Sequence, residues 1–287
     1  MTGRILKGVG GFYTVLAGSG RTVICKARGR FRKDGLAPLP GDMTEITALP
    51  DGTGRLDEIL PRRNVFIRPP VANIDALVLV AGLTPPVSTE FWIDRILAVA
   101  RQKGASPILC LNKSDLDAGR DAEELAALYR AAGCTVIRTS AVTGEGAEEL
   151  RQAVKGKVAA FSGHSGVGKS SLLNLLMPGM ALPVGELSEK LGRGRHTTRH
   201  VELFEGPGGS WVADTPGFSA FDPEQMDMPG RAELPSLFPE FEDCRCRFQD
   251  CAHINEKDCG VRQAVDAGAI ARSRYESYIK IYGMLNR

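Results

Sequence analysis

The sequence predicts a multidomain α/β protein, and three observations along the chain support that prediction. Short apolar stretches broken by glycine turns fill residues 1–68, strands alternate with helices over residues 69–230, and cysteines gather in residues 231–287 before a helical tail. A chain of 287 residues is also long for a single domain. These three ranges are therefore the predicted domains.

The first range predicts a small β-barrel, because short strands with frequent turns are typical of that architecture. The expected strands are Arg4–Val9, Phe12–Ala17, Arg21–Ala27 and Asp42–Leu49. Residues 1–65 carry eleven Lys and Arg against six Asp and Glu, a local net charge of +5, whereas the whole chain carries +2. Such an excess suits a nucleic-acid surface on a barrel of the oligonucleotide-binding (OB) type. An SH3-like barrel and a merely solvated basic loop stay open as alternatives.

The middle range predicts a mostly parallel sheet. Pro69-Pro70 indicates its start, and apolar strands then alternate with amphipathic helices, as in βαβ units. The expected strands are Ile74–Ala81, Pro107–Leu111 and Thr135–Arg138, and the expected helices are Thr89–Lys103, Asp121–Ala132 and Glu145–Ala153. A hairpin is expected at Val201–Glu205 and Ser210–Ala213.

A phosphate-binding loop is predicted between a strand at Val158–Phe161 and a helix at Ser171–Leu176. Residues 163–170 fit G-x-x-x-x-G-K-S without a mismatch, in the strand–loop–helix context that distinguishes this loop from an ordinary glycine turn. Backbone N–H groups and the helix N-terminus would bind phosphate, Lys169 would reach the β- and γ-phosphates, and the Ser170 hydroxyl would ligate Mg²⁺. The expected nucleotide-binding residues are Gly163, His164, Ser165, Gly166, Val167, Gly168, Lys169, Ser170 and Ser171.

Two further motifs indicate guanine as the base. Residues 112–115 fit N-K-x-D, in which the Asp115 carboxylate would accept hydrogen bonds from the guanine N1–H and amino group. Adenine offers no such donor pair, so Asp115 would select GTP over ATP. The Lys113 stem would cover the base, Asn112 would connect neighbouring loops, and Ser140-Ala141 matches an S-A element whose backbone bonds guanine O6. A solvated turn is the alternative for motifs this short.

The tetrapeptide Asp214-Thr215-Pro216-Gly217 follows the predicted hairpin. Asp214 suits the acid that holds Mg²⁺ through water, and the Gly217 N–H would bond the γ-phosphate and respond to its loss. A surface turn is the alternative explanation. The N-K-x-D and S-A motifs precede the phosphate loop here, which reverses the order of Ras-like GTPases and indicates a circular permutation.

The cysteine cluster predicts a metal site. Cys246, Cys251, His253 and Cys259 offer three thiolates and one imidazole within 14 residues, a set suited to one closed, structural Zn²⁺. Cys244 is the alternative to Cys246, and a redox role or simple burial is the alternative to metal. The other cysteines, Cys25, Cys110 and Cys134, occupy apolar contexts typical of a core.

Cytoplasmic localisation is expected from the absence of targeting signals in the sequence. No apolar run approaches the roughly 18 residues of a membrane span, and residues 1–8 lack the apolar core of a signal peptide. In that compartment cysteines bind metal or stay reduced more often than they pair.

Together the permuted motif order, the N-terminal β-domain and the Cys-x₄-Cys-x-His-x₅-Cys pattern resemble the ribosome small-subunit-dependent GTPase A family (RsgA, also called YjeQ). Residues 68–75 resemble the family's domain junction, and residues 194–198 resemble its switch loop. The resemblance spans nearly the whole chain and is least distinct in the barrel.

The resemblance implies an N-terminal OB-like barrel, a circularly permuted P-loop GTPase domain and a C-terminal helical zinc-binding domain. It implies GTP or GDP, Mg²⁺ and one structural zinc as ligands, and a monomer that binds the small (30S) ribosomal subunit and its rRNA, with no membrane. Hydrolysis would serve late maturation of that subunit and be stimulated by it.

Catalytic roles also follow from the resemblance. Thr198, or alternatively Thr197, would contact Mg²⁺ and the γ-phosphate, and Lys169 would stabilise the phosphates. Phe218 stands where Ras-like enzymes often place a water-orienting Gln, so His196 is the candidate replacement. That role needs a ring nitrogen within hydrogen-bond reach of the water, and a solvated histidine is the alternative.

Two other functions remain open at this point. One is an RNA-binding GTPase of another pathway, such as tRNA modification. The other is a non-catalytic RNA-binding module that uses nucleotide as a structural ligand, which the intact Lys169, Ser170 and Asp214 argue against. Residues 228–239 carry too little pattern for a structural prediction.

Overall fold

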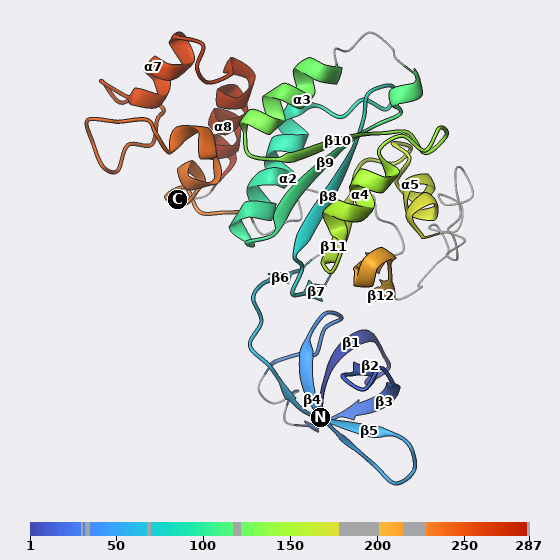
Figure 1. The fold of residues 1–287 in the computed structure, drawn as a ribbon. Helices are drawn as coiled ribbons and strands as arrows, with labels where there is room; N and C mark the ends of the chain where they lie inside the picture. Colours follow the sequence, from blue (N-terminus) through green and yellow to red (C-terminus); the bar gives the residue numbers. More distant parts are fainter. Residues whose placement is uncertain are drawn as a thin grey trace.

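The computed structural model describes residues 1–29, 31, 35–67, 70–116, 122–177, 201–214 and 228–285. These residues form three parts that follow one another along the chain (Figure 1). A barrel holds the N-terminus, an α/β part occupies the middle, and a helical C-terminal part packs beside helix α2. The predicted fold class is confirmed.

The N-terminal part is a closed barrel with its own apolar core. Strand β1 pairs with β2 on one side and with β4 on the other, which closes the sheet in the order β1-β2-β3-β5-β4. The strands are β1 (Thr2–Val9), β2 (Phe12–Ala17), β3 (Thr22–Ala27), β4 (Met43–Ala48) and β5 (Gly54–Ile59). Strand β5 was not predicted, because Arg55, Asp57 and Glu58 surround its two buried side chains, Leu56 and Ile59.

The α/β part contains the predicted parallel sheet, in the order β10-β9-β8-β11-β13-β12. Within this part of the described chain, β12 and β13 form an antiparallel hairpin, and the other strand pairs are parallel. The strands are β8 (Ala76–Gly82), β9 (Ser106–Asn112), β10 (Thr135–Thr139), β11 (Val158–Ser162), β12 (Glu202–Glu205) and β13 (Trp211–Asp214). The helices are α2 (Glu90–Gln102), α3 (Ala122–Ala131), α4 (Ala147–Val154) and α5 (Lys169–Leu176). Every element predicted here is confirmed, with small shifts at its ends.

Register places the ends of three strands side by side. Asn112 of β9 lies opposite Gly82 of β8 and opposite Thr139 of β10, and all three strands run in the same direction. Strand β11 is parallel to β8, so the phosphate loop that follows it leaves the same edge of the sheet. Ligands of open α/β sheets bind at this edge, at the carboxyl ends of the strands.

The C-terminal part is built from short helices around a second apolar core. Its elements are η4 (Leu234–Leu237), η5 (Pro239–Phe241), α7 (Gly260–Asp266) and α8 (Arg272–Met284). Helix α8 confirms the predicted tail, whereas η4, η5 and α7 were not predicted. Pro235 and Pro239 each occupy the first turn of a 3₁₀ helix, where proline is tolerated, but their pattern is too short to predict one.

Short elements connect these parts. The hairpin of β6 (Val65–Phe66) and β7 (Val71–Ala72) lies across the predicted boundary between residues 68 and 69. Among the described residues of the α/β part, two 3₁₀ turns lie between the longer elements: η1 (Ser114–Leu116) and η2 (Pro207–Gly209). None of the helices in the described ranges is long and apolar enough to cross a membrane. The predicted core cysteines Cys25, Cys110 and Cys134 are buried, as expected.

Candidate functional site

The phosphate loop depends on glycine at two close approaches. A Cβ atom on Gly163 would lie 2.5 Å from the Val80 carbonyl oxygen, and one on Gly168 would lie 2.4 Å from Nδ2 of Asn112. Both glycines also have positive φ angles, of 155° and 96°. Their lack of side chains lets the loop pack against β8 and β9, which is why this loop returns so tightly to the edge of the sheet.

Lys169 is buried at the base of this loop, with 8% of its surface exposed. Its ammonium donates hydrogen bonds to the carbonyl oxygens of Gly163 (2.6 Å) and His164 (2.9 Å). Burial lowers the pKa of Lys169 to about 8. Burial, together with the nearby charge of Lys169, also lowers the pKa of His164. The loop therefore holds a desolvated cation on its own carbonyl oxygens, next to the residues where phosphate is expected.

Asn112 connects three motifs that are distant in the sequence. Its Nδ2 donates to the Val167 carbonyl oxygen in the phosphate loop (2.7 Å), and its Oδ1 accepts from the Thr139 hydroxyl just before the S-A element (3.0 Å). The side chain is almost fully buried. One amide thus fixes the phosphate loop relative to both base-recognition segments, as the sequence analysis expected for Asn112.

Two crossing hydrogen bonds join the N-K-x-D turn to the S-A loop. The Ser140 hydroxyl donates to Oδ1 of Asp115 (2.5 Å) and accepts from the N–H groups of Val142 and Thr143. The Ser114 hydroxyl donates to Oε2 of Glu145 (2.7 Å). Glu145 was not predicted as a site residue, because no sequence motif marks a residue that supports a neighbouring loop. Asp115 is therefore held in place by Ser140, so its position does not depend on bound base.

Lys113 adopts a left-handed backbone conformation, with φ of 67°. Its ammonium donates to the Pro85 carbonyl oxygen (2.9 Å), in the segment that connects β8 to α2. The N–H of Leu83 in the same segment donates to the Asn112 carbonyl oxygen (3.1 Å). The segment from β8 to α2 thus contacts the base-recognition turn, a contact that the motifs did not predict.

Several predicted site residues lie outside the described ranges. His196, Thr197, Thr198, Gly217 and Phe218 belong to this group. Asp214 is the last residue of β13, next to β11, and its side chain is likewise outside the described part. Their roles stay predictions.

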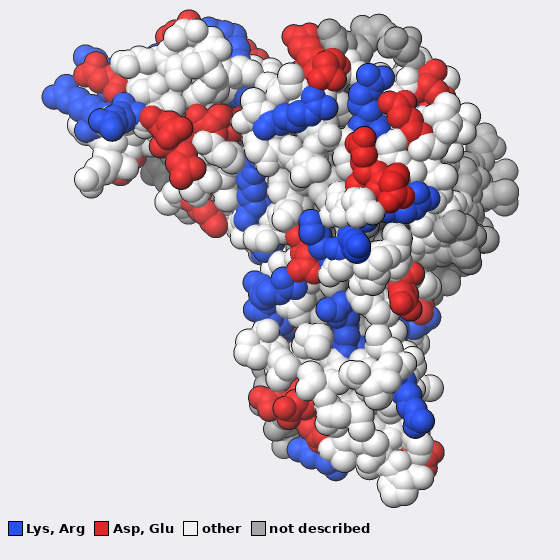
Figure 2. Space-filling view, in the orientation of Figure 1, with Lys and Arg blue, Asp and Glu red and all other residues white. Residues whose placement is uncertain are grey.

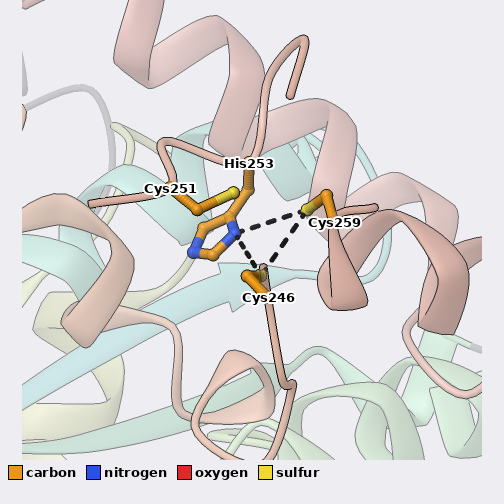
Figure 3. Close-up of side chains that lie close together, drawn as sticks. All are labelled: Cys246, Cys251, His253 and Cys259. Atoms are coloured by element: carbon orange, nitrogen blue, oxygen red, sulfur yellow. Dashed lines mark hydrogen bonds between the residues drawn. The ribbon is translucent and has the colours of Figure 1, made fainter. Parts of the chain in front are cut away.

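The four predicted metal ligands converge in the C-terminal part (Figure 3). The Cys246 and Cys259 sulfurs lie 3.9 Å apart, and each lies 3.5 Å from Nδ1 of His253. All four donor atoms, including Sγ of Cys251, lie within 4.8 Å of one another. A tetrahedral zinc with Zn–S bonds of about 2.3 Å and Zn–N bonds of about 2.0 Å separates its ligand atoms by roughly 3.5–3.8 Å. The donor set and its spacing therefore fit one zinc ion.

The loops around this cluster are shaped to hold it. A Cβ on Gly260 would lie 2.4 Å from the Arg245 carbonyl oxygen, and the Gly260 N–H donates to Cys246 Sγ (3.3 Å). Burial raises the pKa of Cys246, but hydrogen bonds from the backbone of Val261 and Gly260 outweigh it, and the pKa is lowered overall. Hydrogen bonds from backbone N–H groups to the sulfur stabilise the thiolate, which is the form that binds metal. Cys244, the alternative ligand, is not among the four converging residues.

Aromatic and polar side chains surround the four converging ligands. The Tyr275 and Tyr278 hydroxyls donate to the carbonyl oxygens of His253 and Ala252, each at 2.6 Å. The Glu256 carboxylate accepts backbone N–H groups from the same loop. These bonds fix the loop that carries His253, so the ligand is oriented by α8 as well as by its own backbone.

Comparison with protein families gives matches over most of the chain. Residues 59–224 match the family model described as RsgA GTPase, and residues 2–56 match the model described as RsgA N-terminal domain.

Curated relatives match over nearly their full length. A protein of Caldanaerobacter subterraneus subsp. tengcongensis is 46% identical over 97% of this chain and 94% of its own. A protein of Geobacillus kaustophilus is 45% identical over 96% of this chain and 94% of its own. Both carry the name small ribosomal subunit biogenesis GTPase RsgA.

Two solved structures are also similar. YjeQ from Thermotoga maritima has a TM-score of 0.85 at 35% identity, covering 100% of this chain and 99% of its own. YloQ, described as a circularly permuted GTPase, has a TM-score of 0.81 at 35% identity, covering 98% and 93%. The description of YloQ agrees with the permuted motif order of this chain.

Proposed function

The chain belongs to the RsgA GTPase family and is therefore a GTPase, and from this premise we propose that its GTP hydrolysis serves late maturation of the small ribosomal subunit. In this proposal the subunit stimulates hydrolysis, and the protein binds the subunit's rRNA. The names of the curated relatives support this pathway.

One observation carries the assignment of the nucleotide site. The buried Asn112 side chain bonds both Val167 and Thr139, so the phosphate loop, the N-K-x-D turn and the S-A loop meet at one edge of the sheet. A site assembled from three segments before the ligand arrives is preorganised for a nucleotide. The permuted chain order does not disturb this assembly.

Each predicted residue then has a role toward the nucleotide. Asp115 would accept from guanine, with its other oxygen held by Ser140. Ala141 would bond guanine O6 through its backbone, and the Lys113 stem would cover the base. The phosphate loop, from Gly163 to Ser171, would surround the phosphates, with Lys169 moving its ammonium from loop carbonyls toward phosphate oxygens.

The hydrolytic step needs residues of the switch segments. Ser170, Thr198 and Asp214 would hold Mg²⁺, with Thr197 as the alternative to Thr198, and the ion supplies charge neutralisation at the β- and γ-phosphates. Gly217 would bond the γ-phosphate. His196 would orient the attacking water once the subunit has fixed the loop that carries it.

The Cys₃His cluster would hold one structural zinc through Cys246, Cys251, His253 and Cys259. Four protein ligands close a tetrahedral site, so the ion would support the fold of the C-terminal part rather than take part in hydrolysis.

The barrel and the C-terminal part would both contact the small ribosomal subunit. Figure 2 shows Lys and Arg side chains near the junction of the barrel with the α/β part and at the far end of the C-terminal part, with acidic side chains between them. Within the basic N-terminal range of residues 1–65, Arg28 pairs with Asp57 at 2.9 Å, and Lys26 lies over the exposed ring of Phe12. In this proposal the three domains span residues 1–68, 69–230 and 231–287. The protein acts as a monomer in the cytoplasm.

Steady-state GTP hydrolysis with and without purified small subunits tests this proposal. We expect a large, GTP-specific rise with the subunit, and Lys169→Ala should lose hydrolysis in both conditions. ATP and large ribosomal subunits are the matched controls. Hydrolysis indifferent to small subunits would contradict the ribosomal role and favour a GTPase of another pathway, such as tRNA modification.

The low pKa of Lys169 gives an independent test of the phosphate site. In the free protein this pKa is about 8, and a bound phosphate would raise it, so binding takes up a proton above that pH. Affinity for labelled GDP should therefore fall as pH rises above about 8, by at most about tenfold per pH unit. A flat profile up to about pH 9 would contradict the contact between Lys169 and phosphate.

A further inference from the structure

An aromatic residue outside every nucleotide motif packs on the phosphate loop. The ring of Trp92, in the first turn of α2, lies 4.0 Å from the imidazole of His164 between ring centroids, at an interplanar angle of 31°. This is close for an aromatic pair, whose centroids usually lie about 4.5–7 Å apart. His164 is the second residue of the G-x-x-x-x-G-K-S loop, so Trp92 contacts the loop directly.

The contact fixes a part of the loop on which Lys169 depends. The His164 carbonyl oxygen accepts a hydrogen bond from the Lys169 ammonium (2.9 Å), and Gly163 next to it accepts another. On the other side of the loop, Asn112 holds the Val167 carbonyl oxygen. The residues between these two points, Ser165 and Gly166, are exposed. The loop is therefore held at both ends, by Trp92 at one and by Asn112 at the other.

Helix α2 provides Trp92 with a rigid base. The Thr89 side chain caps the helix by accepting from the Trp92 N–H (3.3 Å). The next turns of α2 are buried from Ile93 to Ala100, and Asp94 forms an ion pair with Arg274 of α8. A side chain on such a helix is well suited to holding a loop in one conformation.

We propose that Trp92 is a positioning residue of the phosphate loop, whose stack on His164 keeps the loop in its nucleotide-binding conformation before nucleotide arrives. This inference rests on the proposed assignment of that loop to GTP. Trp92 acts through His164 and not on the reacting atoms, so it should change nucleotide affinity and leave the chemical step unchanged.

Binding of labelled GTP and GDP to Trp92→Ala tests the proposal. The removed stack should weaken both nucleotides about three- to tenfold, the range expected for an aromatic pair. The turnover number at saturating GTP should be unchanged, and Trp92→Phe, which keeps a ring, should recover most of the affinity. Trp211→Phe is the matched control, because Trp211 lies on β13 beside Arg4 of the barrel. Unchanged affinity in Trp92→Ala would overturn the proposal.

Two further measurements exclude a general loss of structure. In a double-mutant cycle, Trp92→Ala and His164→Ala should be non-additive, since each removes the same contact. The chain has two tryptophans, so Trp211→Phe leaves Trp92 as the single emitter, and its fluorescence should change when His164 is replaced. Additive mutations, or Trp92 emission unaffected by replacement of His164, would also overturn the proposal. Nucleotide binding is measured without ribosomes, so failure here is distinct from failure of the ribosomal role.

Discussion

The two outer parts of the molecule join the α/β part in different ways. The C-terminal part shares its interior with it, because Ala98 of α2 belongs to the apolar core of the C-terminal part. Arg274 of α8, with 2% of its side chain exposed, forms ion pairs with Asp94 of α2 and with Glu240 of η5. Arg101 of α2 also donates to the Leu237 carbonyl oxygen (3.0 Å).

The barrel, in contrast, has a core of its own and meets the α/β part along a polar strand edge. One residue pair, Lys7 and Glu202, joins β1 to β12, and their ion pair is about one-third exposed at both side chains. Leu6 packs on the α/β core, and the buried Asn73 amide donates to the Gly41 carbonyl oxygen (3.0 Å).

This difference predicts which parts of the molecule unfold together. Removing one acid from the buried junction leaves the buried Arg274 charge incompletely paired, whereas water hydrates the remaining member of a broken exposed pair at little cost. The C-terminal part and α2 should therefore unfold together, and the barrel should stay folded through that event. The nucleotide site shares helix α2 with the C-terminal junction through Trp92 and Asp94.

Removal of metal should give the largest effect. Structural zinc in small Cys/His sites contributes on the order of 10–16 kcal/mol of apparent binding free energy, which is also folding free energy. Treatment with a chelator, or Cys259→Ser, should unfold residues 228–285 and expose α2. Hydrogen exchange read by region should then rise in α2 and α8 and stay unchanged in β1–β5.

The matched control is Cys244→Ser, because Cys244 lies close to the cluster but outside the four converging residues. It should keep one zinc per chain by metal analysis. Loss of zinc in this variant would contradict the proposed ligand set. If the barrel unfolds together with the C-terminal part after metal removal, the two parts are not energetically independent, and the prediction is wrong.

Asp94→Ala should give the next largest effect. It leaves the buried Arg274 with Glu240 as its remaining ion-pair partner, and breaking a buried pair by removing one member costs about 3–5 kcal/mol. Urea unfolding monitored by far-UV circular dichroism measures the change. The control is Glu123→Ala, which removes an exposed pair with Arg130 and should cost less than about 1 kcal/mol. Equal losses of unfolding free energy in the two variants would contradict the predicted difference between the buried and the exposed ion pair.

The sequence predicted the order of elements better than it predicted these junctions. Strands β8, β9 and β11 are continuous apolar runs, and helix α2 follows a clear cap at Thr89, so local pattern is sufficient there. Strand β5 and helix α7 are short and carry their apolar side chains among charged ones, so pairing partners and the metal loop determine them.

The residues of the nucleotide site could likewise be predicted only in part. Motif spacing identified Asn112, Asp115 and Lys169, because close phosphate and base recognition restricts residue type. It did not identify Glu145, which bonds Ser114, or Trp92, which contacts His164. These two side chains act through tertiary contacts between segments distant in the chain, and no local pattern records such contacts.

Asn73→Gly should give an intermediate effect at the barrel junction. Asn73 has a positive φ of 58°, which glycine adopts without strain, so this change removes the amide without straining the backbone. The Gly41 carbonyl oxygen and the Arg63 N–H would each lose a partner, at a cost of about 1–3 kcal/mol. Trp211 lies near Arg4 of the barrel, so its fluorescence in Trp92→Phe protein reports this junction during urea unfolding. An effect as large as that of Asp94→Ala would show that the barrel is held as firmly as the C-terminal part.

The smallest effect is expected from Lys7→Ala. Its ion pair with Glu202 is partly exposed, and such pairs contribute up to about 1 kcal/mol, which salt screens further. A double-mutant cycle with Glu202→Ala should give a coupling energy in that range, and it should shrink toward zero at an ionic strength of about 1 M. Because β12 also pairs with β13, which ends at Asp214, a larger coupling would mean that the barrel edge supports the sheet beside the nucleotide site. That result would mean that the two junctions do not differ in energy, since the barrel and the C-terminal part would both be strongly coupled to the α/β part.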